Sequence, residues 1–210
     1  MKVNALNLYL AKLIDIGLVV SFNAITDKKL QGNKIEIEVG DTSQTADFNL
    51  AHEGSIQHYI DIVNSSQYSA LLFDGSLLQL KYRIKSRTII WHRFVFIPGL
   101  AEQNLDNPFH EFDFGGNPIL EPRKTCLRFE YDPEEKAPNH PASHLHLNSG
   151  NCRIPINTRL GVKKYIWILC ELFYPEFLPE LEDERLGRNF NDNSATDKLR
   201  PNILIPQNNS

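Results

Sequence analysis

The stretch that decides the fold is DGSLLQLKYRI (74–84), which is followed by KSR (85–87) and TIIWHRFVFIP (88–98). Four apolar side chains of the first segment share one face: Leu78, Leu80, Tyr82 and Ile84. Three polar ones share the other: Gln79, Lys81 and Arg83. This alternation predicts a half-buried strand, whereas the second segment is apolar on both faces and ends at Pro98-Gly99. The short connection therefore predicts an antiparallel hairpin at the centre of a sheet.

Four further segments predict strands around this hairpin: IEIEV (35–39), CLRFEYD (126–132), SHLHL (143–147) and CRIPI (152–156). All four alternate between two faces. In CRIPI, alternation turns Cys152 inward and Arg153 outward, and Pro155 indicates a sheet edge or a strand end.

Helical spacing of apolar residues predicts three helices, at about 3–16, 55–64 and 160–173. The expected buried positions are Val3, Leu6, Leu10, Leu13 and Ile14, then Ile56, Tyr59, Ile60 and Val63, then Tyr165, Ile168, Leu169 and Leu172. Together these elements predict an α+β fold, with a mostly antiparallel sheet packed against N-terminal and C-terminal helices.

The chain of 210 residues is long enough for one domain, which we expect over 1–181, with a polar, largely disordered or loosely docked tail over 182–210. Residues 101–123 are expected to form a long loop. The net charge of -4 gives no global basic signature, although a local basic face can still bind nucleic acid. Three cysteines without a C-x-x-C pair favour reduced thiols and a cytoplasmic protein. No apolar run approaches the ~20 residues of a membrane span, so no membrane partner is expected.

The stretch APNHPASHLHL (137–147) gathers three of the seven histidines. If 143–147 is a strand, His144 and His146 share one face, because side chains alternate. The apolar set Leu127, Phe129, Tyr131, Leu145 and Leu147 needs the core. The opposite, wetter face then carries Arg128, Glu130, Asp132, His144 and His146. Lys81 and Arg83 extend this face if the hairpin belongs to the same sheet.

Three interpretations of this face remain open. In the first, His144 and His146 exchange protons in phosphodiester chemistry, Asp132 or Glu130 orients a histidine, and Arg128, Arg83, Arg153 and Lys81 hold phosphate. This interpretation needs neither a metal nor another cofactor. In the second, the two histidines and Asp132 or Glu130 bind a metal ion. In the third, the face is structural, with carboxylates and arginines paired across strands.

Several segments carry a resemblance, in the order LLFDGSLLQLKYRI, WHRFVFIP, LRFEYDP, HPASHLHL, CRIPI and ELFYPE, from about residue 70 to 176. As an ordered set they resemble a family of bacterial proteins catalogued only as a domain of unknown function. LRFEYD and HPASHLH are more distantly similar to TumE-like proteins of toxin–antitoxin operons. That likeness implies an accessory or toxin-like role acting on RNA or nucleotides. The chain is longer than such toxins, and no catalytic residue can be carried over.

Together these observations favour a toxin–antitoxin or phage-defence protein that binds RNA and cleaves it through the His/Arg face. We expect His146→Ala to abolish activity and leave the fold intact, because the face is expected to be solvated. The second hypothesis is a non-enzymatic protein that binds a cognate partner encoded nearby. The third is a metal-dependent hydrolase.

Overall fold

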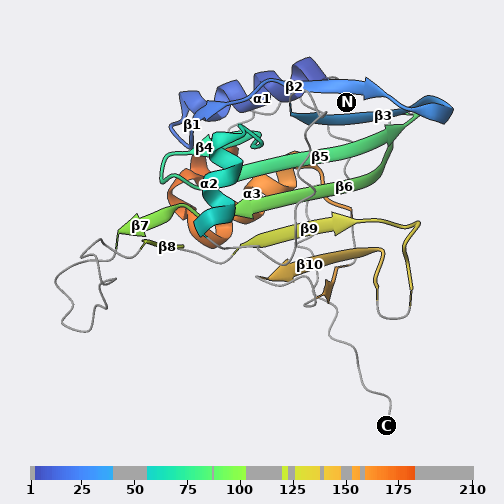
Figure 1. The fold of residues 1–210 in the computed structure, drawn as a ribbon. Helices are drawn as coiled ribbons and strands as arrows, with labels where there is room; N and C mark the ends of the chain where they lie inside the picture. Colours follow the sequence, from blue (N-terminus) through green and yellow to red (C-terminus); the bar gives the residue numbers. More distant parts are fainter. Residues whose placement is uncertain are drawn as a thin grey trace, which may run out of the picture.

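The computed structural model describes residues 3–39, 56–86, 88–102, 120–122, 126–137, 140–147, 153–156 and 159–182. The elements, in chain order (Figure 1), are α1 (Val3–Asp15), β1 (Val19–Phe22), β2 (Ile25–Lys29), η1 (Gln31–Asn33), β3 (Lys34–Val39), α2 (Ile56–Asn64), β4 (Ala70–Leu72), β5 (Leu77–Lys85), β6 (Thr88–Ile97), β7 (Leu100–Glu102), β8 (Leu120–Pro122), β9 (Leu127–Tyr131), β10 (Ser143–Leu147), β11 (Ile154–Pro155), α3 (Val162–Phe173), η4 (Pro175–Phe177) and α4 (Leu178–Glu182). They confirm the predicted α+β class.

One antiparallel sheet organises the described residues. Its strand order is β1-β4-β5-β6-β9-β10-β11, and β2 and β3 join it through β5. The predicted hairpin is confirmed at its centre, because β5 and β6 pair from Leu77–Ile97 to Lys85–Thr88. On its other side β5 pairs with β4 near its start and with β3 near its end. Thus β6 lies between β5 and β9, which sets the spacing of the polar groups described below.

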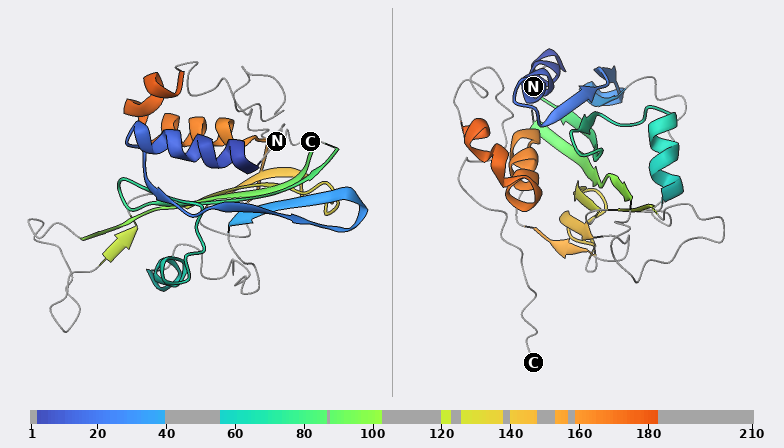
Figure 2. Two further views of the ribbon diagram at one scale, coloured as in Figure 1. Left: turned by 90° about the horizontal axis from the view of Figure 1, so that it is seen from above. Right: turned by 90° about the vertical axis from the view of Figure 1, so that its left-hand side faces the viewer.

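Helices α1 and α3 cover one face of the sheet (Figure 2). This face holds the main core, built from α1 residues such as Leu6 and Leu10, the alternating Leu78, Leu80 and Tyr82 of β5, and Tyr165 of α3. The Asn7 side chain fastens α1 to β2, since its amide donates to the Ile25 carbonyl and accepts the Ile25 N–H.

Helix α2 lies on the opposite face (Figure 2). Ile62 packs there with Leu77, Val95, Ile97 and Cys126 in a smaller apolar cluster. The prediction that Ile60 and Val63 are buried is wrong, since each is 38% exposed. The helix packs on the sheet through Tyr59 and Ile62, which contact the start of β5 and the end of β6. The remainder of this face carries the polar side chains.

Two other predicted core positions are exposed, Ile14 at 39% and Leu172 at 57%, because they lie at the edges of their helices' buried faces. The predicted loop over 101–123 begins and ends in paired strands, since β7 and β8 form a small antiparallel sheet. Its middle, Cys152 and the predicted tail from residue 183 lie outside the described residues. Cys126 and Cys170 are buried free thiols. No helix in the described ranges has the length and apolar character needed to cross a membrane.

Candidate functional site

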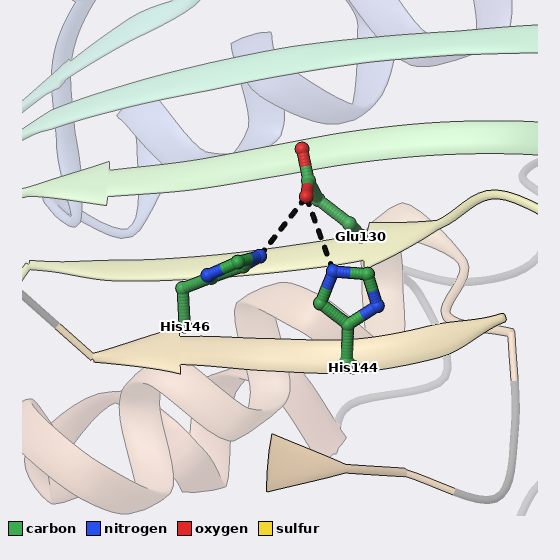
Figure 3. A group of neighbouring side chains, drawn as sticks. All are labelled: Glu130, His144 and His146. Atoms are coloured by element: carbon green, nitrogen blue, oxygen red, sulfur yellow. Dashed lines mark hydrogen bonds and ion pairs between the residues drawn. The ribbon is translucent and has the colours of Figure 1, made fainter. Parts of the chain in front are cut away.

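Strands β6, β9 and β10 bring the polar side chains together by register. Arg93 of β6 pairs with Glu130 of β9, and Glu130 pairs in turn with His144 of β10. Two residues further along, Arg128 pairs with His146. Cross-strand partners point to the same face of a sheet, so these five side chains gather beside one another. We call Glu130, His144 and His146 the histidine–glutamate cluster (Figure 3).

The two carboxylate oxygens of Glu130 have different partners. Oε1 accepts a hydrogen bond from Nε of Arg93 at 2.6 Å and lies 3.4 Å from Nε of Arg128. Oε2 lies 3.2 Å from Nε2 of His144 and 3.1 Å from Nε2 of His146 (Figure 3). The arginines therefore fix the carboxylate from one side, and both imidazoles converge on its other oxygen.

The protonation of His144 follows from its second ring nitrogen. Nδ1 lies 2.7 Å from the Pro141 carbonyl oxygen, which only accepts hydrogen bonds, so Nδ1 carries a proton. Nε2 of a neutral His144 is then an acceptor that faces the acceptor Oε2 of Glu130. A metal ion placed between these atoms would be bound by both of them. A backbone carbonyl bound to the far ring nitrogen is the usual support of a metal-binding histidine.

Burial corrects one expectation about this face. His144 and Arg128 are 0% and 1% exposed, so the predicted wetter face is wrong for the cluster. The polar groups bond to one another across the strands, which allows them to be buried. The argument that His146→Ala leaves the fold intact because the face is solvated also fails, since His146 is 1% exposed.

The electrostatics prepare the cluster for a cation. Burial raises the pKa of Glu130, but contacts with His144 and His146 and the charges of Arg93 and Arg128 outweigh it and hold that pKa well below its ordinary value. Burial lowers the pKa of His146, which the contact with Glu130 offsets only in part. At neutral pH the cluster thus has an ionised carboxylate and a neutral His146, the forms in which both groups bind metals.

Two of the three distances between ligand atoms suit a divalent metal ion. In the described part of the chain, Glu130, His144 and His146 form one group whose potential ligand atoms all lie within 4.8 Å of one another. Metal–ligand bonds of about 2.0–2.2 Å at angles between octahedral and tetrahedral place neighbouring ligand atoms about 2.8–3.5 Å apart. The two distances from Glu130 Oε2, at 3.1 and 3.2 Å, fall within this range. The two imidazole nitrogens lie within 4.8 Å of each other and would have to approach to bind one ion.

The other carboxylate that was predicted to orient a histidine has different partners. Oδ2 of Asp132 accepts the indole N–H of Trp91 at 3.0 Å. Its Oδ1 accepts the backbone N–H groups of Glu134 and Glu135. Asp132 therefore closes a turn after β9. Of Glu130 and Asp132, it is Glu130 that contacts the two histidines.

The predicted phosphate-binding residues divide into two groups. Lys81 and Arg83 lie on the same sheet face, as expected, but β6 separates them from β9 and both pair with Glu36. Arg128 joins the cluster. Arg153 immediately precedes β11, and continuing the β10–β11 register sets it opposite His146. Its Nε is buried and has no hydrogen-bond partner among the described residues.

The sequence prediction missed Arg93 as a partner of Glu130. Alternation along TIIWHRFVFIP puts Trp91 and Arg93 on one face, but only the order of the strands reveals that this face adjoins Glu130. His92 points the other way and lies in the core, since it is fully buried and its Nε2 accepts the Leu160 N–H. Burial lowers the pKa of His92 to about 3.

Comparison with known proteins identifies the family but no function. No curated protein and no solved structure matches the chain. The likeness to TumE-like proteins stays a prediction. One family model matches residues 5–205, so it covers nearly the whole chain and extends into the predicted tail. The chain therefore belongs to the family described as Uncharacterized conserved protein (DUF2290).

Proposed function

We propose that the histidine–glutamate cluster binds a divalent transition metal ion and that the protein uses it to hydrolyse phosphodiester bonds in RNA. The observation that carries this proposal is the convergence of three ligand atoms, with Nδ1–H of His144 fixed by the Pro141 carbonyl. Two histidines and a glutamate are a ligand set of catalytic zinc, and two histidines with a carboxylate also bind iron.

A metal centre fits better than a metal-free pair of histidines. In the metal-free interpretation each imidazole must exchange a proton with substrate. Nε2 of His144 and of His146 instead points to the same oxygen of Glu130. Nitrogens held in this way suit metal binding better than proton exchange with a substrate.

The surrounding charge favours an anionic substrate. Arg93 and Arg128 already outnumber the single carboxylate of Glu130, and a divalent ion would increase the positive excess. A phosphodiester would offset it, and the ion would supply an activated water and polarise the phosphoryl group. Water adds to phosphorus, the bond to the leaving alcohol breaks, and the alcohol oxygen takes up the proton that water loses. In the toxin–antitoxin or phage-defence setting implied by the resemblance, the substrate would be RNA.

Metal analysis of untagged protein is the first test. We expect about one zinc, iron or manganese ion per chain, and its loss in Glu130→Gln and His146→Gln. His140→Gln is the matched control, because the His140 ring lies 4.8 Å from that of His144 but outside the ligand set.

The second test follows end-labelled single-stranded RNA with and without EDTA. Cleavage that EDTA abolishes and metal restores supports the proposal. Cleavage that survives EDTA but is lost in His146→Gln returns these residues to acid–base chemistry. Absence of both metal and cleavage overturns the proposal and favours the interaction protein, to be pursued through its co-purifying partner.

A further inference from the structure

An aromatic side chain lies beside the cluster on the same sheet face. Trp91 precedes Arg93 by two residues on β6, so both point to the face that carries Glu130. Arg93 links the two places, because its guanidinium lies 5.7 Å from the Trp91 ring centroid while its Nε donates to Glu130. Trp91 is therefore displaced by two residues along the strand, roughly 7 Å, from the cross-strand row that contains Arg93 and Glu130.

The Trp91 ring is held in place and half-buried. Its indole N–H donates to Asp132 across the β6–β9 pair. Arg83, its cross-strand partner on β5, places its guanidinium carbon 4.8 Å from the ring centroid, a cation–π contact. The Arg83 side chain as a whole is 40% exposed.

Three cations and three carboxylates lie around this part of the face. Lys81 and Arg83 pair with Glu36, Arg93 pairs with Glu130, and Asp132 accepts the indole N–H of Trp91. Aromatic and guanidinium planes among cations are the groups with which proteins bind unpaired nucleotides.

We propose that Trp91 and Arg83 form a stacking platform for a nucleobase of single-stranded nucleic acid, whose backbone continues toward the histidine–glutamate cluster. The direction toward the cluster rests on the proposed function. A single strand is required, because bases in a duplex are already stacked and paired and cannot offer their faces. The platform selects the unpaired state of the substrate, and the cluster acts on its phosphate.

The fluorescence of Trp91 tests this directly. The chain has two tryptophans, so Trp167→Phe leaves Trp91 as the single reporter. The protein is titrated in EDTA with a 12-nucleotide single-stranded RNA, its DNA counterpart, an abasic strand of equal length and a duplex. We expect both single strands to quench the fluorescence, and the abasic strand and the duplex to bind about 5- to 100-fold more weakly.

Two variants separate stacking from charge. Arg83→Lys keeps the charge and removes the planar group, so binding of the single strand should weaken about fivefold or more while binding of the abasic strand is unchanged. Trp91→Leu should show the same selective loss by fluorescence anisotropy of labelled RNA. Equal affinity for the abasic and the natural strand, or unchanged binding in Arg83→Lys, would overturn the platform.

The failure of this inference is distinguishable from the failure of the proposed function. Binding is measured in EDTA, where neither a metal ion nor cleavage contributes to the signal. If the protein stacks single strands but holds no metal, the platform is supported and the proposed hydrolase function fails. If the protein holds metal but binds abasic and natural strands equally, the metal centre is supported and the platform proposal fails.

Discussion

At the scale of single residues, Glu130 is the charge on which its neighbours depend. Its carboxylate faces Arg93, the fully buried Arg128 and two buried histidines. Removing one partner of a buried ion pair leaves the other charges uncompensated in a medium that solvates them poorly. The cost of that loss exceeds what the pairs themselves contribute to stability.

We therefore expect Glu130→Gln to lower the free energy of unfolding by about 3–5 kcal/mol, measured by urea denaturation in EDTA. Glu36→Gln is the matched control, because Glu36 also faces two cations. The Lys81 and Arg83 side chains are 32% and 40% exposed and keep their water, so we expect the control to cost about 1 kcal/mol or less. Equal costs in the two variants would show that burial of Arg128 and the histidines does not govern the effect.

His92 makes the stability depend on pH. The folded protein keeps this side chain neutral down to a pKa of about 3, whereas in the unfolded chain it titrates near 6.5. Between these values the unfolded state binds the additional proton, so stability falls as the pH falls. At pH 5 the loss from this one group is about 2 kcal/mol relative to pH 8.

Urea denaturation of the wild type and His92→Gln at pH 8 and pH 5 measures this contribution. Glutamine retains an acceptor for the Leu160 N–H but takes up no proton. We expect the variant to lose about 2 kcal/mol less than the wild type between the two pH values. An identical loss would mean that other groups, His146 among them, carry the acid sensitivity.

At the scale of elements, the sequence predicted which segments are strands and helices better than it predicted which helix residues are exposed. The hairpin 74–98 and the strands at 35–39, 126–132 and 143–147 are confirmed, because alternation reports directly on a sheet with two different faces. Burial of Ile60 and Val63 was predicted wrongly, because an apolar stripe does not reveal how much of a helix its neighbours cover. Helix α2 touches the sheet mainly through Ile62 and Tyr59.

Directly after β6, Gly99 is packed closely against the backbone of the turn before β5. The Pro98-Gly99 pair predicted the end of the strand but not this close packing. A Cβ on Gly99 would lie 2.5 Å from the Asp74 carbonyl oxygen and 2.8 Å from the carbonyl carbon of Gly75. The Gly99 N–H also donates to the Ser76 hydroxyl, which ties the strand to the turn before β5. The glycine is thus required by close approach of two backbones.

We expect Gly99→Ala to destabilise the protein by about 1–3 kcal/mol, because backbone atoms cannot move aside as a flexible side chain can. Thermal denaturation followed by circular dichroism measures the change. A change below about 0.5 kcal/mol, the usual range for a surface substitution, would show that the turn at 74–76 and β6 separate at little cost.

At the scale of the whole molecule, the sequence identified most members of the site but not their arrangement. Alternation alone predicted that Glu130, His144 and His146 share a face, and the structure confirms it. Insertion of β6 between β5 and β9 is a property of topology, which local patterns do not encode. That one insertion brings Arg93 to Glu130 and leaves Lys81 and Arg83 with Glu36.

The proposed metal centre should couple to the stability of the entire fold, because its ligands come from β9 and β10 of the central sheet. An ion that binds only the folded state adds about 4 kcal/mol at a free concentration of 1,000 times its Kd. For a domain of this size we expect the Tm to rise by roughly 10 °C when zinc is added to protein stripped with EDTA. Differential scanning calorimetry at several zinc concentrations measures the rise. His140→Gln should show the same increase and His146→Gln none, and an equal rise in both variants would move zinc binding away from the cluster.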